Sequence, residues 1–185
     1  KDSLDTAGVI STAGTEGRKD FRPNKDATVV ARLKSAGAIL MGKTNTPSMT
    51  FSFHTENRIY GRTNNPYDTT RSPGGSSGGA AAIVAACGSP FDMGSDTAGS
   101  VRLPAHWCGI AGIKPTSGRG PRTGHIINHT VGALEQLTTI GPLARTVSDL
   151  ELLLPIISGG DGIDPAIVPV KLRDPSLVNI RELRV

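Results

Sequence analysis

The 185-residue sequence has few aromatic residues, few cysteines and no long hydrophobic run. Phe, Trp and Tyr together make up 4% of the residues, and two cysteines are present, Cys87 and Cys108. This cysteine content excludes a disulfide-rich scaffold and favours a reducing compartment, and we expect both thiols in the core. No apolar stretch approaches the ~20 residues of a membrane-spanning helix, and no segment has the pattern of a signal peptide. We therefore expect a cytoplasmic protein without a membrane span.

The charged residues and the histidines exclude two further classes. The formal net charge is +4, but Lys and Arg are scattered and line no single helix, so we do not expect nucleic acid as a partner. No spacing typical of metal ligands joins His54, His106, His125 and His129, so the sequence predicts no metal site. What the chain does have is 37% hydrophobic residues, 23 glycines and 13 prolines, which indicates a globular domain with many tight turns.

Hydrophobic spacing predicts alternating helices and strands. Residues Ala27–Ala36 have helical spacing between the N-cap candidate Asp26 and Gly37, and the apolar run Ala38–Gly42 directly after them predicts a buried strand. A helix followed by a buried strand indicates an α/β fold. Further helices are predicted at Ala80–Cys87 and Thr146–Ser158, and short strands at Phe91–Gly94, at Ile110–Lys114 and, by its onset, at Glu182–Val185.

A glycine- and serine-rich stretch, RSPGGSSGGAAA at residues 71–82, allows several functions. It opens into an apolar helix, so a flexible linker is disfavoured, and no lysine follows its last glycine, so a phosphate-binding loop is disfavoured too. Gly75–Gly79 also matches the G-x-S-x-G pattern of a nucleophile elbow, which would make Ser77 the nucleophile. Pro73 stands where an elbow has a strand, which weakens this interpretation without removing it.

A second run of small residues, GSDTAGS, covers Gly94–Ser100. Successive small residues let several backbone N–H groups converge on one point, as an oxyanion hole requires. The predicted helix between the two serine-bearing loops is short enough to bring both loops to one edge of a sheet. With a lysine as base, such a pair of loops would form an acyl-transfer site that needs no histidine.

These two loops carry a resemblance to a known family. Residues 72–118, SPGGSSGGAAAIVAACGSPFDMGSDTAGSVRLPAHWCGIAGIKPTSG, resemble the signature region of the amidase signature family, which includes fatty acid amide hydrolase and bacterial amidases. The likeness extends through DATVVARLKSAGAILMGKTN at 26–45, TENRIYGRTNNPYD at 55–68 and LTTIGPLARTVSDLELLL at 137–154, so nearly the whole chain is covered. The family cleaves carboxylic amides with a Ser-cis-Ser-Lys triad and no cofactor, and this implies a small-molecule amide as the substrate.

The resemblance assigns roles residue by residue. Ser100 matches the nucleophile, Ser76 the bridging serine on a cis peptide, and Lys1 the base. The backbone N–H groups of four residues match the oxyanion hole: Thr97, Ala98, Gly99 and Ser100. Asp96 and Arg102 match polar residues that support this loop, and Ser77 matches a neighbour that hydrogen-bonds locally. Ala98 departs from the glycine of many members, but its N–H is kept.

The implied fold is α/β, with a mixed central sheet flanked by helices. The chain begins at Lys1 without a Met, so residues 1–185 are interpreted as the amidase signature core segment of a longer single-domain enzyme. The oligomeric state stays open, with a homodimer among the arrangements allowed. Two other functions stay open as well. One is the amidase subunit of a glutamine-dependent tRNA amidotransferase, which TPSMT at 46–50 and SGRGPRTGHI at 117–126 disfavour relative to stand-alone amidases. The other is an inactive anion-binding or scaffold domain.

Overall fold

The computed structural model describes residues 1–128 and 132–184. Its helices are α1 (Thr28–Ser35), α2 (Gly78–Ala85), α3 (Arg102–Trp107), α4 (Ala133–Leu137) and α5 (Val147–Ile157). Its strands are β1 (Glu56–Asn57), β2 (Gly61–Arg62), β3 (Phe91–Asp96), β4 (Ala111–Gly112) and β5 (Thr139–Ala144). Short 3-10 helices lie at Glu16–Arg18, Ser48–Thr50, Pro175–Leu177 and Ile180–Glu182. No helix in the described ranges is long and apolar enough to cross a membrane.

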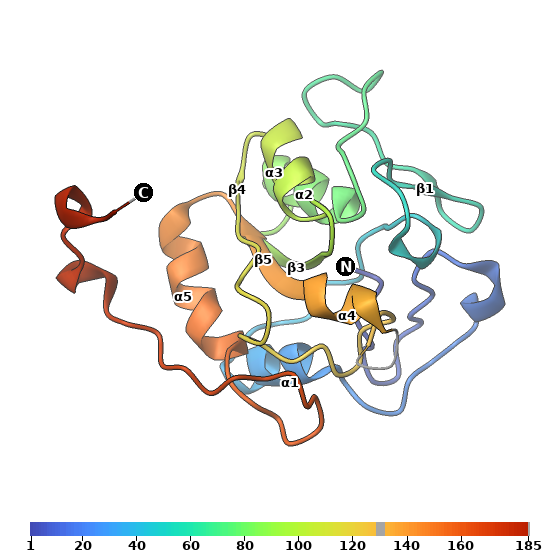
Figure 1. Cartoon of the computed structure of the whole chain (residues 1–185). Coiled ribbons are helices and arrows are strands. Elements are labelled where there is room, and N and C mark those ends of the chain that lie inside the picture. The colour runs from blue at the N-terminus through green and yellow to red at the C-terminus, as the bar shows by residue number, and fades with distance from the viewer. Residues whose placement is uncertain (129–131, 185) are drawn as a thin grey trace.

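The central sheet has the order β3-β5-β4, and both pairs are antiparallel. Its longest ladder aligns Phe91 with Ala144 at one end and Asp96 with Thr139 at the other. Strands β1 and β2 form a separate antiparallel pair near the protein surface (Figure 1). Since Ser100 lies only four residues beyond Asp96, the sheet delivers the GSDTAGS run to its edge on a rigid strand.

Helices cover both faces of this sheet, as Figure 1 shows for α1 and α5 and for the α2–α3 pair. On one face, Met93 and Ile140 pack with buried residues from α1, α5 and the N-terminal segment, namely Leu4, Ala27, Val29, Leu33, Leu153 and Ile157. On the other face, Leu143 packs with residues of α2 and around α3, namely Ala80, Ala81, Val101, Ala105 and Cys108. The fold is therefore α/β with helices flanking a sheet, as predicted.

Helix α2 depends on glycines at its start because neighbouring backbone passes very close. A Cβ atom at Gly78 would lie 2.3 Å from Thr55 Oγ1, and a Cβ atom at Gly79 would lie 2.5 Å from the backbone N and O of Asn45. No side chain fits in such gaps, so the glycines permit the residue 44–55 segment to pack directly on the start of the helix. The glycine–serine stretch is thus part of the packed structure and is not a linker.

The structure corrects two of the predicted helix ends. Ala27, and not Asp26, is the N-cap residue of α1, and the Asp26 carboxylate instead accepts hydrogen bonds from the Ala7 N–H at 2.8 Å and from Lys34 Nζ at 2.8 Å. Helix α2 begins at Gly78 and ends at Ala85. Cys87 therefore lies beyond the helix, with a positive φ of 59°, and is exposed, so its expected place in the core was wrong.

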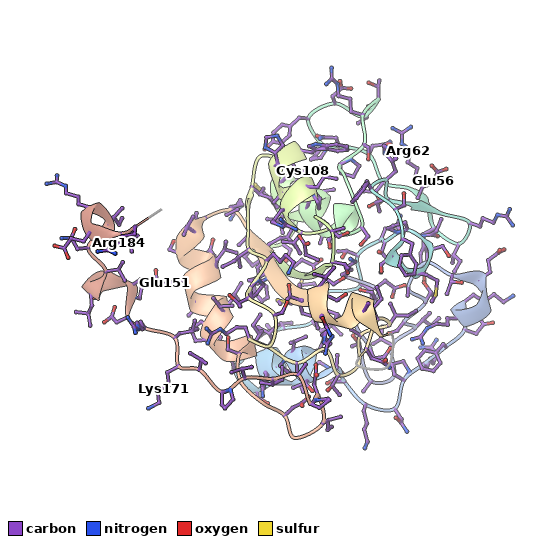
Figure 2. The ribbon with its side chains drawn as sticks, viewed as in Figure 1. Glu56, Arg62, Cys108, Glu151, Lys171 and Arg184 are labelled. Atoms are coloured by element: carbon purple, nitrogen blue, oxygen red, sulfur yellow. The ribbon has the colours of Figure 1, made fainter. Side chains whose placement is uncertain are left out.

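Two predicted strands are not present. Residues 38–42 form no strand, and the side chains of Ile39 and Met41 are 84% and 79% exposed. The sequence pattern is that of a strand, but within the described residues no neighbouring strand pairs with this segment. The C-terminal residues also form no strand: Ile180–Glu182 is a 3-10 helix on an exposed segment that runs away from the main body, as Lys171 and Arg184 show in Figure 2.

Candidate active site

A buried lysine joins two of the predicted site segments. Lys1 Nζ donates hydrogen bonds to Ser76 Oγ at 2.7 Å and to Ser95 Oγ at 2.8 Å, and lies 3.4 Å from the Ser95 carbonyl oxygen. All three residues are buried, with exposed fractions of 4%, 1% and 4% in that order. Lys1 thus contacts both the glycine–serine loop and strand β3 at a point that water does not reach.

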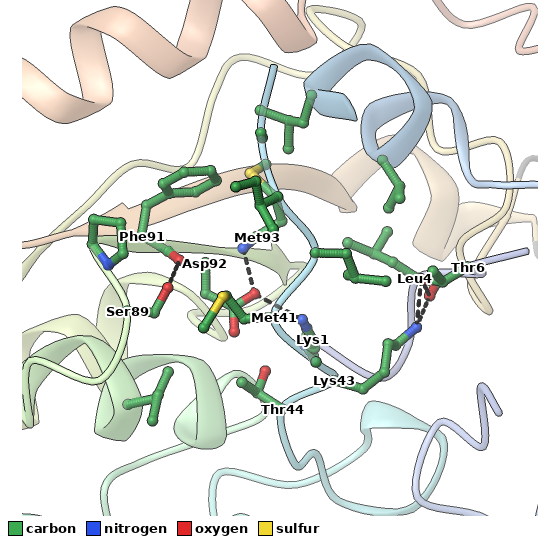
Figure 3. A pocket seen from close by; sticks show the side chains of 18 of the residues that line it. Lys1, Leu4, Thr6, Met41, Lys43, Thr44, Ser89, Phe91, Asp92 and Met93 are labelled. Atoms are coloured by element: carbon green, nitrogen blue, oxygen red, sulfur yellow. Dashed lines mark hydrogen bonds and ion pairs between the residues drawn. The ribbon is translucent and has the colours of Figure 1, made fainter. Parts of the chain in front are cut away.

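Burial makes this lysine a base. Desolvation lowers the pKa of Lys1 from 10.5 to about 7, although the charges of Asp96 and Asp92 act in the opposite direction. The Lys1 α-amino group lies beside Asp92, 2.9 Å from Oδ1, so this carboxylate bonds the backbone end of the residue and not Nζ (Figure 3). Burial, together with the Lys1 charge, also lowers the pKa of His125 to about 3, so this imidazole adds no charge near the site. At neutral pH a large share of Lys1 is an uncharged amine.

Ser76 is held by its backbone. The Gly75–Ser76 peptide bond is cis, as the resemblance implied, and the Ser76 carbonyl accepts a hydrogen bond from Thr46 Oγ1 at 2.9 Å. A Cβ atom at Gly75 would lie 2.7 Å from the Ser52 carbonyl oxygen, so the loop tolerates only glycine here. The sequence pattern did not single out Thr46, because a buried threonine in a polar loop has no distinctive spacing.

Ser100 lies next to this pair through a backbone contact. The Ser77 N–H donates to the Ser100 carbonyl at 3.1 Å, which ties the end of the GSDTAGS run to the start of α2. Ser100 is 9% exposed. Among the hydrogen bonds of the described residues, none joins the Ser76 and Ser100 hydroxyl groups. The structure therefore brings Lys1 and Ser76 into direct contact and places Ser100 beside them, without forming the second link of the expected relay.

The loop before Ser100 is organised around the buried carboxylate of Asp96. This carboxylate accepts from the backbone N–H groups of Gly99 at 2.8 Å, Val101 at 3.0 Å and Arg102 at 3.2 Å. It also accepts from Arg102 Nε at 3.1 Å and Nη2 at 2.9 Å. Burial raises the pKa of Asp96, but these hydrogen bonds, from the Arg102 side chain above all, outweigh it and hold the pKa below its ordinary value. The ionised carboxylate thus fixes the shape of the turn.

This arrangement changes the expected set of oxyanion donors. The Gly99 N–H already donates to Asp96, so it points away from the space in front of Ser100. The N–H groups of Thr97, Ala98 and Ser100 make no hydrogen bond within the described part of the chain. Three of the four expected donors are therefore free to bind an oxyanion, and the fourth has a structural partner.

The other nucleophile candidates lie in unsuitable places. Ser77 is fully buried and its hydroxyl lies 3.4 Å from both the backbone N and the carbonyl oxygen of Ser95, which does not fit an exposed nucleophile elbow. Cys108 is buried between α2 and α3, as Figure 2 shows, and burial raises its pKa to about 11, so the thiol is unreactive and belongs to the core as predicted. His129 lies outside the described residues.

Two hollows lie near these residues, and neither includes a serine of the predicted triad. A largely apolar groove of about 650 Å³ runs between residues 37–44 and the Phe91–Met93 end of β3, with Lys1 at its inner wall (Figure 3). A smaller one of about 370 Å³ is lined by polar residues that include His54, Glu56 and Arg62. Over residues 1–128 and 132–184, no group of three or more His, Cys, Asp or Glu side chains is arranged to hold a metal ion.

The whole chain, residues 1–185, matches the family model described as Amidase. It is 46% identical over 188 residues to the amidase subunit of glutamyl-tRNA(Gln) amidotransferase from Chloroflexus aurantiacus, covering 100% of this chain and 38% of that relative. Among solved structures, the corresponding amidotransferase subunit of Thermotoga maritima superimposes with a TM-score of 0.85 at 39% identity, over 92% of this chain and 37% of the other. The structure of 6-aminohexanoate cyclic dimer hydrolase complexed with substrate gives the same TM-score, 0.85, at 39% identity, over 94% and 36%. The chain thus spans less than two fifths of the length of these proteins.

Fold, loops and sequence agree on one group of proteins. The similarity extends over every element that positions Lys1, Ser76 and Ser100, and it includes both a stand-alone hydrolase and a component of an amidotransferase, with equal TM-scores. This chain belongs to the amidase family.

Proposed function

We propose that the protein hydrolyses a carboxylic amide to an acid and an amine or ammonia, with residues 1–185 as the core segment of a longer single-domain enzyme. One observation carries the proposal. The amine of Lys1, buried and with a pKa of about 7, lies 2.7 Å from the Ser76 hydroxyl, on the cis peptide that the family resemblance implies. A lysine without an acidic partner at Nζ is costly to bury, and a role as a neutral base accounts for it.

The proposed reaction begins with a proton relay. Neutral Lys1 accepts a proton from Ser76, Ser76 accepts one from Ser100, and Ser100 Oγ attacks the amide carbonyl carbon. The relay needs Ser100 Oγ to turn toward Ser76 Oγ, a side-chain rotation within a buried but accessible loop. The Thr97, Ala98 and Ser100 N–H groups then bind the negatively charged oxygen, and losing one such donor typically costs about 100- to 1,000-fold in rate.

The reaction ends with two proton returns. Ser76 passes a proton to the leaving nitrogen, the C–N bond breaks, and an acyl ester remains on Ser100. Water, deprotonated through the same relay, attacks this ester and releases the acid. The Asp96–Arg102 pair takes no proton in this scheme and holds the oxyanion loop in shape, and no metal or organic cofactor takes part.

A second candidate function shares this chemistry. The 46% identity to the amidase subunit of glutamyl-tRNA(Gln) amidotransferase favours a chain that releases ammonia from glutamine for partner subunits, in place of a stand-alone amidase. Against it stands the segment at 46–50, where Pro47, Met49 and two threonines replace the acidic stretch expected of that subunit. Co-purification of the tagged full-length protein from its host separates the two, because the amidotransferase component would bring stoichiometric partners, whereas a stand-alone enzyme would elute alone or as a homodimer.

The amidase proposal is tested with the purified full-length protein and a panel of simple primary and secondary amides, glutamine included. We expect release of ammonia or amine that Ser100→Ala abolishes and Lys1→Ala strongly reduces. Ser35→Ala, an exposed serine at the end of α1, is the matched control and keeps full activity. Activity that persists in Ser100→Ala but is lost in Ser77→Ala would instead support the nucleophile elbow, and a folded protein that turns over no amide would support a scaffold domain.

A further inference from the structure

We propose that Ser95 is a positioning residue that aims the lone pair of Lys1 Nζ at the Ser76 hydroxyl, an inference that rests on the proposed amide hydrolysis. Ser95 was not among the predicted site residues. It lies on β3, one residue before Asp96, and its hydroxyl is 2.8 Å from Lys1 Nζ, a contact as short as the one between Lys1 and Ser76.

The count of donors and lone pairs at Nζ gives Ser95 this role. A neutral amine has two N–H donors and one lone pair, and a base needs the lone pair on the hydroxyl that it deprotonates. Nζ has three oxygen neighbours: Ser76 Oγ, Ser95 Oγ and the Ser95 carbonyl at 3.4 Å. The carbonyl can only accept, so it takes one N–H. When the Ser95 hydroxyl takes the second, the lone pair is left facing Ser76.

The rigidity of Ser95 makes it suited to this task. Strand β3 is paired with β5 along its whole length, and Ser95 is aligned with Ile140. The Ser95 N–H and carbonyl turn the other way and lie 3.4 Å from Ser77 Oγ. Both acceptors for Lys1 therefore come from one residue of a central strand, while the proton donor Ser76 comes from a separate loop.

The charged and titratable groups around Lys1 do not supply an alternative acceptor. Asp92 bonds the Lys1 α-amino group, and both Asp96 oxygens accept from backbone N–H groups and from Arg102. His125 Nδ1 bonds the backbone of Ile127, and its pKa is low enough to keep the ring neutral. Lys43 Nζ donates to the Leu4 carbonyl, Thr6 and Ser11. Among the described side chains, Ser76 and Ser95 are the two that hydrogen-bond Nζ.

The test is Ser95→Ala in the full-length enzyme, with two readouts across pH 5–9: kcat/KM on an amide, and the rate at which a fluorophosphonate labels Ser100. Losing an acceptor that holds the amine should lower both rates by about tenfold or more. The same hydroxyl accepts from the charged form of Lys1, so its loss should also move the acidic limb of both profiles to lower pH. Ser95→Thr keeps the hydroxyl and should restore the wild-type limb.

Thr139→Val is the matched control, because it removes a buried hydroxyl that has no hydrogen-bond partner among the described residues, on the adjacent strand and away from Lys1. It should leave the profile in place. A Ser95→Ala enzyme with the wild-type pH profile, or one that Thr does not rescue, overturns the inference while leaving amide hydrolysis standing. A wild-type protein that neither cleaves amides nor labels at Ser100 overturns the proposed function itself.

Discussion

The pKa of Lys1 gives the sharpest prediction. An ordinary lysine with a pKa of 10.5 is neutral at pH 7 in about one molecule in 3,000, whereas a pKa of about 7 leaves about half of Lys1 neutral. We therefore expect kcat/KM to rise with pH as a single ionisation centred near 7 and to reach a plateau above pH 8. At pH 5 the rate should be about one hundredth of that plateau, since each pH unit below the pKa removes nine tenths of the base.

The same shift has a consequence for stability, and its sign is the reverse of that for a paired carboxylate. Between pH 7 and 10.5 the unfolded chain binds a proton on Lys1 that the folded chain has released, so stability rises with pH across this range. Below pH 7 both states bind the proton and burial costs the folded state about 5 kcal/mol, at ~1.4 kcal/mol per pKa unit. Lys1→Met fills the same space without this cost, so it should unfold at a higher temperature than the wild type at pH 6.

The assay combines both measurements on the full-length protein. Lys1→Met should be more stable at pH 6 by thermal denaturation and yet lose activity by at least 100-fold, which separates lost chemistry from lost folding. A flat pH profile between 5 and 9, or an acidic limb near pH 10, would show that a neutral Lys1 is not the base. A Lys1→Met variant that is less stable at pH 6 would show that the amine is buried in its charged form.

Three further substitutions test the loops around the lysine. Asp96→Asn should lower the free energy of unfolding by about 2–4 kcal/mol in urea denaturation, because the amide cannot accept from Gly99, Val101 and Arg102 together; an unchanged midpoint would mean that the carboxylate does not hold the turn. Gly75→Ala would place a Cβ atom 2.7 Å from the Ser52 carbonyl and should cost about 1–3 kcal/mol, whereas Gly17→Ala, with nothing within 4 Å, should cost little. Ala98→Gly keeps its N–H and should change kcat by less than about threefold, and a larger gain would show that the methyl group obstructs the oxyanion loop.

The sequence was informative wherever local patterns decide the structure. The apolar spacing of α1, the uncharged α2 and the leucine stripe of α5 all correspond to helices, with ends displaced by one or two residues. Strand β5 was missed, although it is the central strand of the sheet, because Gly141 and Pro142 in its middle read as a turn. Its residues form a strand because β3 and β4 pair with it on both sides, and such a partnership cannot be read from one segment.

The candidate site divides in the same way. Lys1, Ser76 and Ser100 came from the resemblance and not from spacing, since isolated serines and lysines are usually ordinary surface residues. Ser95 and Thr46 had no signal of their own, because their importance comes from distances of 2.8 and 2.9 Å across the fold. Conversely, the Gly99 N–H was expected to bind the oxyanion, and only the three-dimensional turn shows that Asp96 already occupies it.

The exposed Ile39 and Met41 face outward beside an edge of β3 that no described strand covers. An edge of this kind offers unsatisfied peptide groups next to apolar side chains, which is the combination that invites two polypeptides to associate edge to edge. The 185-residue polypeptide on its own therefore carries an adhesive seam, and its colloidal behaviour at high concentration should depend on this seam more than on its net charge of +4.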